Sequence, residues 1–360
     1  MKIAFGLGHP AHFHLYKNVI RLLQHKHDIE IFISDKDILR KLLDANNFSY
    51  TAIASARPNE NLFAKARKLL LSTKTLYNII KKNKPDIFVG CISQLCWVSR
   101  LFRKKNIFNA EDDITYTYLQ GFITYPFVNT ILTSKVVKTW PFTYKQIGYA
   151  GYHKLAYLHP KWFTQNESIK NCYIKEPHYF IIRTVNQNAY HDINAKGLDL
   201  KTLRTVVDYL KDYGAVYISS EKPLPEEFQK YALSIKENDI HHVLYYADLF
   251  IGDSQSMAVE SAMLGTPSIR LNNFSNKISI IKELEYTFKL TFSISPKMKD
   301  KIVPLIKDIL SLNREDFRSR RNKMLNEKID VTSFLAWFIE NYQESKKIMK
   351  ENPEYQYRFK

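Results

Sequence analysis

Three histidines stand close together near the start of the chain, in the segment GLGHPAHFH at residues 6–14. Histidine is the side chain whose ordinary pKa best suits proton transfer near neutral pH, so His12 and His14 are candidate catalytic or substrate-orienting groups. Metal binding is the competing interpretation. No carboxylate or cysteine joins the histidines locally and Pro10 interrupts a regular face, so the sequence predicts no metal here.

Three acids form the second cluster: Glu111, Asp112 and Asp113 follow a predicted strand at residues 106–110. Carboxylates at the end of a strand could act as a general base or accept hydrogen bonds from substrate hydroxyls. Paired aspartates could also hold a divalent metal beside a nucleotide diphosphate. A third interpretation is structural, because acids are favoured in the first turn of a helix.

The third cluster lies in ADLFIGDSQSMAVESAMLGTPSIRL, residues 247–271. A short apolar strand leads into a helix that begins within Ser254–Ser256, where a hydroxyl can cap free amides, and ends at Gly265. The start of a helix offers N–H groups and a partial positive charge to a phosphate. Glu260, one turn further on, faces the same mouth and could accept hydrogen bonds from sugar hydroxyls. An ordinary capped helix with a solvated glutamate is the alternative.

Another candidate for anion binding comes at the end of the predicted strand 178–185, where Arg183 stands. A guanidinium can bind a phosphate through two parallel N–H groups, which a lysine cannot do. Ser220 and Lys222 stand at the end of the next predicted strand, 215–220, and in the loop beyond it.

The segment GYAGYHKLAYLHP at residues 148–160 is rich in Gly, Tyr and His and shows no clear periodicity. It is predicted as a hinge between domains, in which His153 and Lys154 either line a cleft or belong to a structural loop. The polar loop at 184–199 contributes His191 and Asp192 as further candidates for the cleft.

Helix and strand signals alternate along most of the chain, which is typical of doubly wound α/β domains. Two similar α/β halves follow one another, without an evident internal repeat of sequence, and the chain then becomes wholly helical. The predicted strands are 2–8, 28–34, 48–54, 86–91, 106–110, 129–134, 178–185, 215–220, 247–252, 268–271 and 286–294. The predicted helices are 14–25, 37–45, 60–83, 93–102, 199–213, 225–233, 241–247, 254–264, 277–285, 297–312, 314–326 and 331–350.

The length of 360 residues and a hydrophobic content of 45% suffice for two domains, predicted at 1–155 and 156–330, with a helical segment at 331–360. The formal net charge of +17 implies an anionic partner: nucleic acid, an acidic membrane surface or a phosphorylated substrate. The lysines are spread along the chain without a dense basic tail, so no nucleic-acid role is predicted.

The predicted helix at 60–83 is basic and amphipathic. It could lie against anionic lipid headgroups, but a solvated face is more common and is favoured here. No run of eighteen apolar residues and no secretory signal is evident, so we expect a cytoplasmic protein, with peripheral contact at the inner face of the membrane left open. The cysteines Cys91, Cys96 and Cys172 form no Cys-x-x-Cys motif and predict neither disulfides nor zinc.

Segments distributed over nearly the entire chain resemble a GT-B-like family known as DUF354: GHPAHFHLYKN, GYHKLAYLHP, IIRTVNQNAYHD, SSEKPLP and GDSQSMAVESAMLGTPSIR. More distantly, the chain is similar to non-hydrolysing UDP-N-acetylglucosamine 2-epimerases and to MurG-type transferases. The resemblance implies an α/β protein of the GT-B fold. In that fold two Rossmann-like doubly wound domains face each other across a cleft, and C-terminal helices cross back onto the first domain.

The same resemblance implies roles for the candidate residues of the second domain. Ser254, Gln255 and Ser256 would meet the diphosphate of a nucleotide sugar. Glu260 would meet the ribose and Arg183 the phosphates. The predicted donor-binding set is completed by Ser220, Lys222 and Met257.

The resemblance implies that the protein is a glycosyltransferase that uses a nucleotide-sugar donor, with UDP-sugars favoured. It would be inverting and metal-independent, with no cofactor. A base from the first domain would deprotonate an acceptor hydroxyl, and the candidates are His12, His14, Asp112 and Asp113. The acceptor would be a glycan or lipid-linked glycan of bacterial capsule or lipopolysaccharide.

The alternative is a non-hydrolysing UDP-sugar 2-epimerase, in which Glu111 falls near the place of an expected acid. The sequence departs from the epimerase pattern, because GDSQSMAVES stands where epimerases typically show a DSGG-like turn. Glu111 is also followed by Asp-Asp, not by the usual Ala-Gly-Leu-Arg run. The transferase is therefore preferred. A non-catalytic protein of polysaccharide assembly is the third hypothesis.

Overall fold

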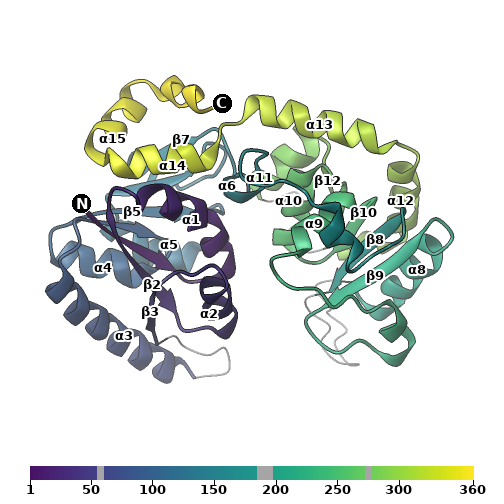
Figure 1. Ribbon diagram of the computed structural model, residues 1–360, viewed down its shortest axis with the longest axis horizontal. Helices are drawn as coiled ribbons and strands as arrows, with labels where there is room; N and C mark the ends of the chain where they lie inside the picture. Colours follow the sequence, from purple (N-terminus) through teal and green to yellow (C-terminus); the bar gives the residue numbers. More distant parts are fainter. Residues whose placement is uncertain (55–60, 185–197, 272–277) are drawn as a thin grey trace. The chain divides into compact units, whose positions relative to one another are not determined.

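Two parallel β-sheets organise the chain, and helices cover both faces of each (Figure 1). The computed structural model describes residues 1–54, 61–184, 198–271 and 278–360. The chain divides into unit 1, which comprises Met1–Tyr157 and Lys328–Lys360, and unit 2, which comprises Leu158–Glu327. The carboxyl-terminal segment therefore belongs to the same unit as the first strand.

The sheet of unit 1 has seven parallel strands in the order β3-β2-β1-β4-β5-β6-β7. Its central strands are buried along almost their whole length, which explains why they read as continuous apolar runs in the sequence. The strands are β1 (Lys2–Leu7), β2 (Asp28–Ser34), β3 (Thr51–Ile53), β4 (Ile87–Gly90), β5 (Lys105–Ala110), β6 (Thr130–Ser134) and β7 (Gln146–Tyr149).

The strand order of unit 1 reverses between β1 and β4, so right-handed crossovers place α1 (Pro10–Leu23) and α2 (Asp37–Asp44) on one face of the sheet and the next helices, from α3 (Leu62–Asn83) to α5 (Tyr118–Thr124), on the other. The face with α1 and α2 also carries α14 (Val331–Glu340) and α15 (Tyr342–Glu351). The other face also carries α4 (Ser93–Leu101). Among the described residues, no helix combines the length and apolarity needed to span a membrane.

The start of α1 differs from the prediction, because the helix begins at Pro10 and not near His14. The His9 side chain caps it by accepting a hydrogen bond from the Ala11 N–H at 3.2 Å. Proline at the first helical position is favourable, since that residue needs no N–H partner and its fixed φ suits the helix. Pro10 therefore starts a regular face, and His12 and His14 lie in the first turns of α1.

The boundary between the two units falls between Tyr157 and Leu158, inside the segment predicted as a hinge, and most of that segment belongs to unit 1. Gly148 and Tyr149 belong to β7, which lies beyond β6 at the edge of the sheet, so the predicted strand at 129–134 is not the last of this half. The chain then forms the short helix α6 (Leu155–Leu158). A second correction concerns the predicted helix at 331–350, which is interrupted at Asn341 and forms α14 and α15.

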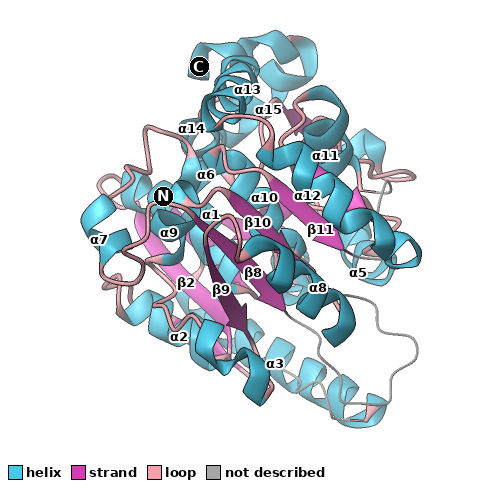
Figure 2. Ribbon diagram, turned by 90° about the vertical axis from the view of Figure 1, so that its right-hand side faces the viewer, coloured by secondary structure: helices cyan, strands magenta, loops and turns pink. Residues whose placement is uncertain are grey.

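The sheet of unit 2 has five parallel strands in the order β12-β11-β10-β8-β9, of which β11, β10, β8 and β9 are labelled in Figure 2. The strands are β8 (Tyr179–Thr184), β9 (Ala215–Ser220), β10 (Leu249–Gly252), β11 (Ser268–Leu271) and β12 (Thr291–Ile294). The helices are α7 (Glu167–Asn171), α8 (Leu200–Leu210), α9 (Ile240–Tyr246), α10 (Gln255–Leu264), α11 (Ser279–Lys282), α12 (Ile302–Leu310) and α13 (Arg314–Glu327). The segment predicted as a helix at 225–233 is a 3₁₀ helix, Glu226–Tyr231.

The main core of unit 2 lies between the sheet and the pair α8 and α12, which pack side by side (Figure 2). Leu203 and Val206 of α8 and Ile306 of α12 contribute fully buried side chains to it. α10 contacts α9 and α13 and also packs on its neighbouring strands. This packing holds α10 with its first turn at the carboxyl end of β10.

Candidate active site

The carboxyl edge of the unit 1 sheet changes direction between β1 and β4, which is the place where open α/β sheets bind ligands. The backbone of β1 lies close to Gly90 of β4, which has no side chain, and the absence of a side chain on Gly6 leaves room for Leu95. Gly90 has a φ of 151°, and a Cβ on it would collide with the backbone of Gly6. β1 leads directly into α1. β5, the strand next to β4, ends directly before the three acids.

A small pocket of about 110 Å³ opens at this edge. Four of its side chains are candidates from the sequence: His12, Glu111, Asp112 and His153. They come from α1, the end of β5 and the segment after β7, so the fold brings distant parts of the chain together. The complete lining is His12, Cys91, Phe108, Asn109, Ala110, Glu111, Asp112, Thr117, Gln120, Tyr125 and His153.

Glu111 is held as a carboxylate by two neighbours from the segment after β7. Its Oε1 lies 3.0 Å from the Lys154 ammonium nitrogen, and its Oε2 lies 3.8 Å from Nδ1 of His153. Burial alone would raise the pKa of Glu111, but Lys154 and His153 outweigh it and hold that pKa well below the usual range. Lys154 is itself only 2% exposed, whereas 29% of the Glu111 side chain is exposed, so water reaches the pair from the Glu111 side.

Asp112 has the opposite electrostatic environment, although it is the next residue. Burial and the negative charge of Glu111 raise the pKa of Asp112 to about 6. Two neighbouring carboxylates whose environments push their pKa values apart are the usual basis for separate acid and base roles. Asp112 is therefore the carboxyl of this site that can exchange a proton near neutral pH.

Two buried polar groups of the pocket have no hydrogen-bond partner among the described residues: the side-chain amide of Asn109 and Nε2 of His153. Both residues are at least nine-tenths buried. Leaving a buried polar atom unpaired costs about 1–3 kcal/mol, so these atoms are the ones that a polar ligand would satisfy. The sequence does not single out Asn109, because nothing in it shows which polar side chain of this strand reaches a pocket.

His12 lies at the pocket but is poorly suited to accept a proton. Its Nδ1 accepts a hydrogen bond from the Gly8 N–H at 3.0 Å, so the neutral ring carries its proton on Nε2. Burial and the nearby His9 lower the pKa of His12 to about 3. The ring is thus a neutral hydrogen-bond donor at physiological pH, which favours substrate orientation over general base catalysis.

The structure places His14 and Asp113 outside this pocket. His14 packs between aromatic rings, with its centroid 5.1 Å from that of Tyr157 and 5.5 Å from that of Phe13. Asp113 is 2% exposed and accepts a hydrogen bond from the Lys138 N–H at 2.7 Å. These contacts indicate structural roles for both side chains.

In unit 2 the strand order reverses between β8 and β10, and the first turn of α10 begins at this point. Ser254 caps the helix, since its Oγ accepts a hydrogen bond from the Met257 N–H at 3.4 Å. Residues 253–257 are all partly accessible. Gln255 and Ser256 therefore lie in a helix N-terminus that packed side chains do not seal, as anion binding requires.

Arg183, at the end of β8, already has partners. Its two terminal nitrogens donate to Ser219 Oγ at 2.8 Å and to Glu221 Oε1 at 2.9 Å. Its Nε is buried and has no hydrogen-bond partner in the part of the chain that the structure describes. A phosphate that accepts hydrogen bonds from both terminal nitrogens of this guanidinium would have to displace the half-exposed Glu221. Ser220, next to Ser219, accepts a hydrogen bond from the Lys222 N–H at 3.3 Å.

Glu260 lies deeper than the sequence predicts, with 8% of its surface exposed. Its Oε2 is 3.5 Å from Nε2 of His241, a buried residue of α9. The interpretation as a solvated glutamate is therefore wrong, because α9 packs over this face of α10. The predicted ribose contact remains a prediction.

Two further candidates for the cleft, His191 and Asp192, fall within 185–197, outside the described residues. Among the residues that are described, no group of three histidine, cysteine, aspartate or glutamate side chains is arranged to hold a metal ion.

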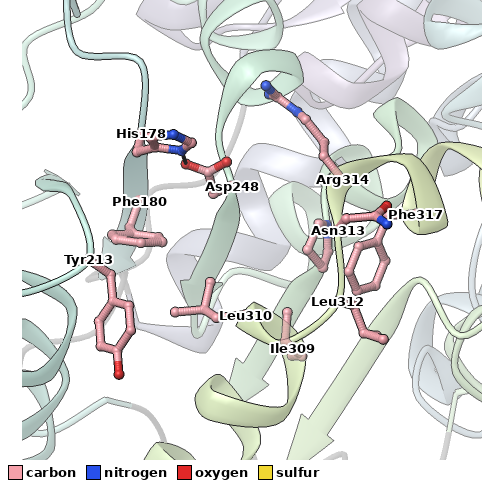
Figure 3. A pocket seen from close by; sticks show the side chains of 11 residues that line it. His178, Phe180, Tyr213, Asp248, Ile309, Leu310, Leu312, Asn313, Arg314 and Phe317 are labelled. Atoms are coloured by element: carbon pink, nitrogen blue, oxygen red, sulfur yellow. Dashed lines mark hydrogen bonds and ion pairs between the residues drawn. The ribbon is translucent and has the colours of Figure 1, made fainter.

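A larger pocket in unit 2, about 400 Å³, lies at the amino ends of β8, β10 and β11 (Figure 3). Figure 3 shows apolar side chains such as Phe180 and Ile309 on one side and the His178–Asp248 pair on the other. His178 Nδ1 is 3.3 Å from Asp248 Oδ2, and Arg314 donates to the carbonyl of Tyr245 at 3.1 Å. Its charged groups have protein partners, and ligands of such sheets bind at the opposite edge.

Two units of parallel α/β sheet, each with its strand order reversed in the interior, define the GT-B class of proteins, and solved structures with this fold are similar to the chain. UDP-N-acetylglucosamine 2-epimerase from Rickettsia bellii is 13% identical, with a TM-score of 0.67 and coverage of 97% of this chain and 98% of that one. The Neisseria meningitidis enzyme of the same name, bound to UDP-GlcNAc, is 11% identical, with a TM-score of 0.66 over 95% and 100%. MurG from Acinetobacter baumannii is 13% identical, with a TM-score of 0.61 over 95% and 100%.

The family is established by sequence. A family model described as "Protein of unknown function (DUF354)" matches residues 1–286, and the chain belongs to this family. No curated protein matches the sequence. At identities of 11–13% the similar structures establish the fold and leave the activity to be argued from the site.

Proposed function

We propose that the protein is an inverting glycosyltransferase that uses a nucleotide-sugar donor, with UDP-sugars favoured. The observation that carries the proposal is the pair Glu111 and Asp112, adjacent carboxyls with oppositely shifted pKa values at the carboxyl edge of the unit 1 sheet. Transfer to a hydroxyl needs a base that is mostly ionised at neutral pH yet still basic enough to take a proton. Asp112 meets both requirements.

In the proposed reaction the acceptor oxygen attacks the anomeric carbon of the donor sugar, and the bond from that carbon to the diphosphate breaks. The hydroxyl proton passes to Asp112, and the bonding electrons leave with the nucleoside diphosphate. The first turn of α10 and Arg183 would stabilise the charge of this leaving group, and Glu260 would bind the ribose. Asn109, His12 and His153 would bind hydroxyls of the acceptor or sugar. This scheme requires no metal.

We place the reaction in bacterial surface polysaccharide assembly, with a glycan or lipid-linked glycan of capsule or lipopolysaccharide as acceptor. The net charge of +17 supports an anionic environment for the protein, which a nucleotide diphosphate and an inner-leaflet surface both provide. The protein would then act in the cytoplasm, in peripheral contact with the membrane.

A UDP-sugar 2-epimerase is the second candidate. Epimerisation needs a group that removes a proton from the sugar ring and one that returns a proton to it, and Glu111 with Asp112 provides two carboxyls of different basicity. Two of the three similar structures named above carry the epimerase name. The Lys154 ion pair argues against an epimerase, since it holds the pKa of Glu111 well below its usual range and so makes Glu111 a weak base.

The test is to incubate the purified protein with UDP-, GDP- and CMP-sugars, with and without acceptor glycans, and to follow free nucleotide and the donor sugar. A transferase releases nucleotide mainly when acceptor is present. A changed sugar or a glycal without acceptor would identify the epimerase instead. Donor binding without either product would leave a non-catalytic assembly protein and refute the proposal.

A further inference from the structure

The outer surface of α3, α4 and α5 exposes large apolar side chains to an extent that the fold does not require. Leu70 of α3 is 72% exposed, Leu101 of α4 is 68% exposed and Leu119 of α5 is 66% exposed. Single exposed leucines are ordinary, but apolar patches spread over adjacent elements mark an interaction surface. Other exposed members are Leu71, Tyr118, Phe122 and Ile123.

These helices form one continuous layer on one face of the unit 1 sheet. Gln94 of α4 donates to Ser72 of α3, while Trp97 of α4 donates to the Ile123 carbonyl of α5 at 2.8 Å. α4 thus lies between α3 and α5 and contacts both. Their solvent-facing side chains therefore share a single surface.

α5 presents its apolar side outward for a structural reason. Gly121 is buried, and a Cβ at this position would press against Ile114, so the helix is seated with Gly121 inward. Leu119, Phe122 and Ile123 then project together on the exposed side, at the spacing of neighbours on a helix surface.

The charge on this surface has one sign. α3 contains Lys65, Arg67, Lys68, Lys74, Lys81 and Lys82 and no acidic residue. No aspartate or glutamate occurs from residue 87 to 110 or from residue 114 to 166. The opposite helix face is mixed, since α2 and α15 each combine acidic and basic residues.

We propose that the outer surface of α3, α4 and α5 docks on an anionic lipid bilayer. Arg67 and Lys74 flank the exposed leucines of α3 on the same side of that helix and meet the headgroups, while Leu119 and Phe122 of α5 enter the apolar boundary. Aliphatic side chains gain nothing from phosphates or bases, which favours a lipid surface over nucleic acid as the anionic partner.

The surface adjoins the candidate active site, because Thr117, just before α5, and Gln120, within α5, line the pocket that contains Asp112. Docking would bring this pocket to the membrane surface. This position of the pocket implies the class of acceptor, which is a glycan presented on a membrane-held lipid. That last step rests on the proposed function, whereas the docking does not.

The experiment is flotation of the full chain with vesicles of phosphatidylcholine alone or of equal parts phosphatidylcholine and phosphatidylglycerol, without any nucleotide sugar. We expect binding only to the anionic vesicles, weakened by added salt. The double variants R67E/K74E and L119S/F122S should each lower the partition coefficient about tenfold or more. The matched controls K347E/K350E on α15 and Leu22→Ser on α1 should change it less than about twofold.

Equal binding of the wild type to neutral vesicles, no binding to either, or an equal loss in the α15 control would overturn the proposal. So would retention of a single-stranded RNA probe by a wild type that ignores vesicles. Thermal unfolding of each variant checks that it is folded. Failure here leaves transfer to a water-soluble acceptor unaffected, and failure of that transfer leaves vesicle binding unaffected, so the two proposals are separable.

Discussion

The two sheets carry different kinds of groups at the points where their strand order reverses. In unit 1 the edge has opposed charges on side chains, unpaired buried polar atoms and a small pocket. In unit 2 the edge has the N-terminus of α10 and an arginine that is occupied by Ser219 and Glu221. A reversal of strand order therefore supports proton chemistry in one unit and suits anion binding in the other.

The difference arises from the groups that each fold brings to the ends of its strands. In unit 1 the segment after β7 returns Lys154 and His153 to the end of β5, so that two neighbouring carboxyls have unlike surroundings. In unit 2 the groups are backbone amides and a guanidinium, whose charge does not change near neutral pH. Substitutions in unit 1 should thus affect turnover, and those in unit 2 should affect donor affinity.

The largest effect is expected from Asp112→Asn. Loss of the general base should reduce turnover about a hundred- to ten-thousandfold while nucleotide affinity persists. In the wild type, turnover should fall as the pH is lowered through about 6, since protonated Asp112 cannot accept a proton. Initial rates measure turnover and its pH dependence, and calorimetry measures nucleotide affinity. Asp113→Asn is the matched control, because its amide oxygen can still accept the Lys138 N–H; equal loss in both variants would remove Asp112 from the role.

The same variant makes a prediction about stability. The pKa of Asp112 is higher in the folded protein than its ordinary 3.8, so its contribution to stability is present below that value and is lost as the pH rises through about 6. At about pH 8 the neutral Asp112→Asn protein should therefore be more stable than the wild type, by about 1.5 kcal/mol after allowance for solvent screening. Urea unfolding at several pH values tests this.

Lys154→Met should have the next largest effect. It leaves the Glu111 carboxylate without its strongest partner and should lower stability at neutral pH by about 2 kcal/mol, less than for a fully buried pair. Because the pKa of Glu111 is depressed in the folded state, the contribution of the pair is present above about 4.5 and is lost on further acidification. The wild type and variant should converge in acid; a constant difference would show that Lys154 acts through packing.

Local sequence was a good guide to unit 2. The β10-α10-β11 unit was predicted from Ser254, Gly265 and Pro267, whose turn chemistry acts over a few residues, and the structure confirms it with Gly265 at a φ of 85°. In unit 1, Pro10 was misjudged because the capping side chain, His9, is an uncommon one. The Glu111–Lys154 pair could not be foreseen, since it depends on β7 joining the sheet beside β6, and Asn109 gives no signal from within its strand.

Arg183→Lys tests the anion-binding character of unit 2. A lysine cannot replace a forked contact, so donor affinity should fall about tenfold with little change in the rate at saturating donor. Glu221→Gln should raise affinity about threefold, because it releases the guanidinium that Glu221 occupies. The control is Arg204→Lys, because Arg204 of α8 donates through two nitrogens to Glu227. This variant should change neither the donor affinity nor the rate at saturating donor. An unchanged Kd in Arg183→Lys would contradict the phosphate role.

The smallest effect is expected at Glu260, whose proximity to His241 gives it a structural role as well as the predicted ribose contact. Glu260→Gln keeps the volume and one acceptor oxygen but weakens its hydrogen bonds to hydroxyls, so UDP should bind about threefold less well. Affinity for 2′,3′-dideoxy-UDP should not change, because the ribose hydroxyls are missing. His241→Asn perturbs the same contact from α9 and should alter stability without altering the ratio of the two affinities. If both variants change that ratio equally, Glu260 acts only by supporting α10, and the distinction between the two units would then rest on Arg183 and the helix amides alone.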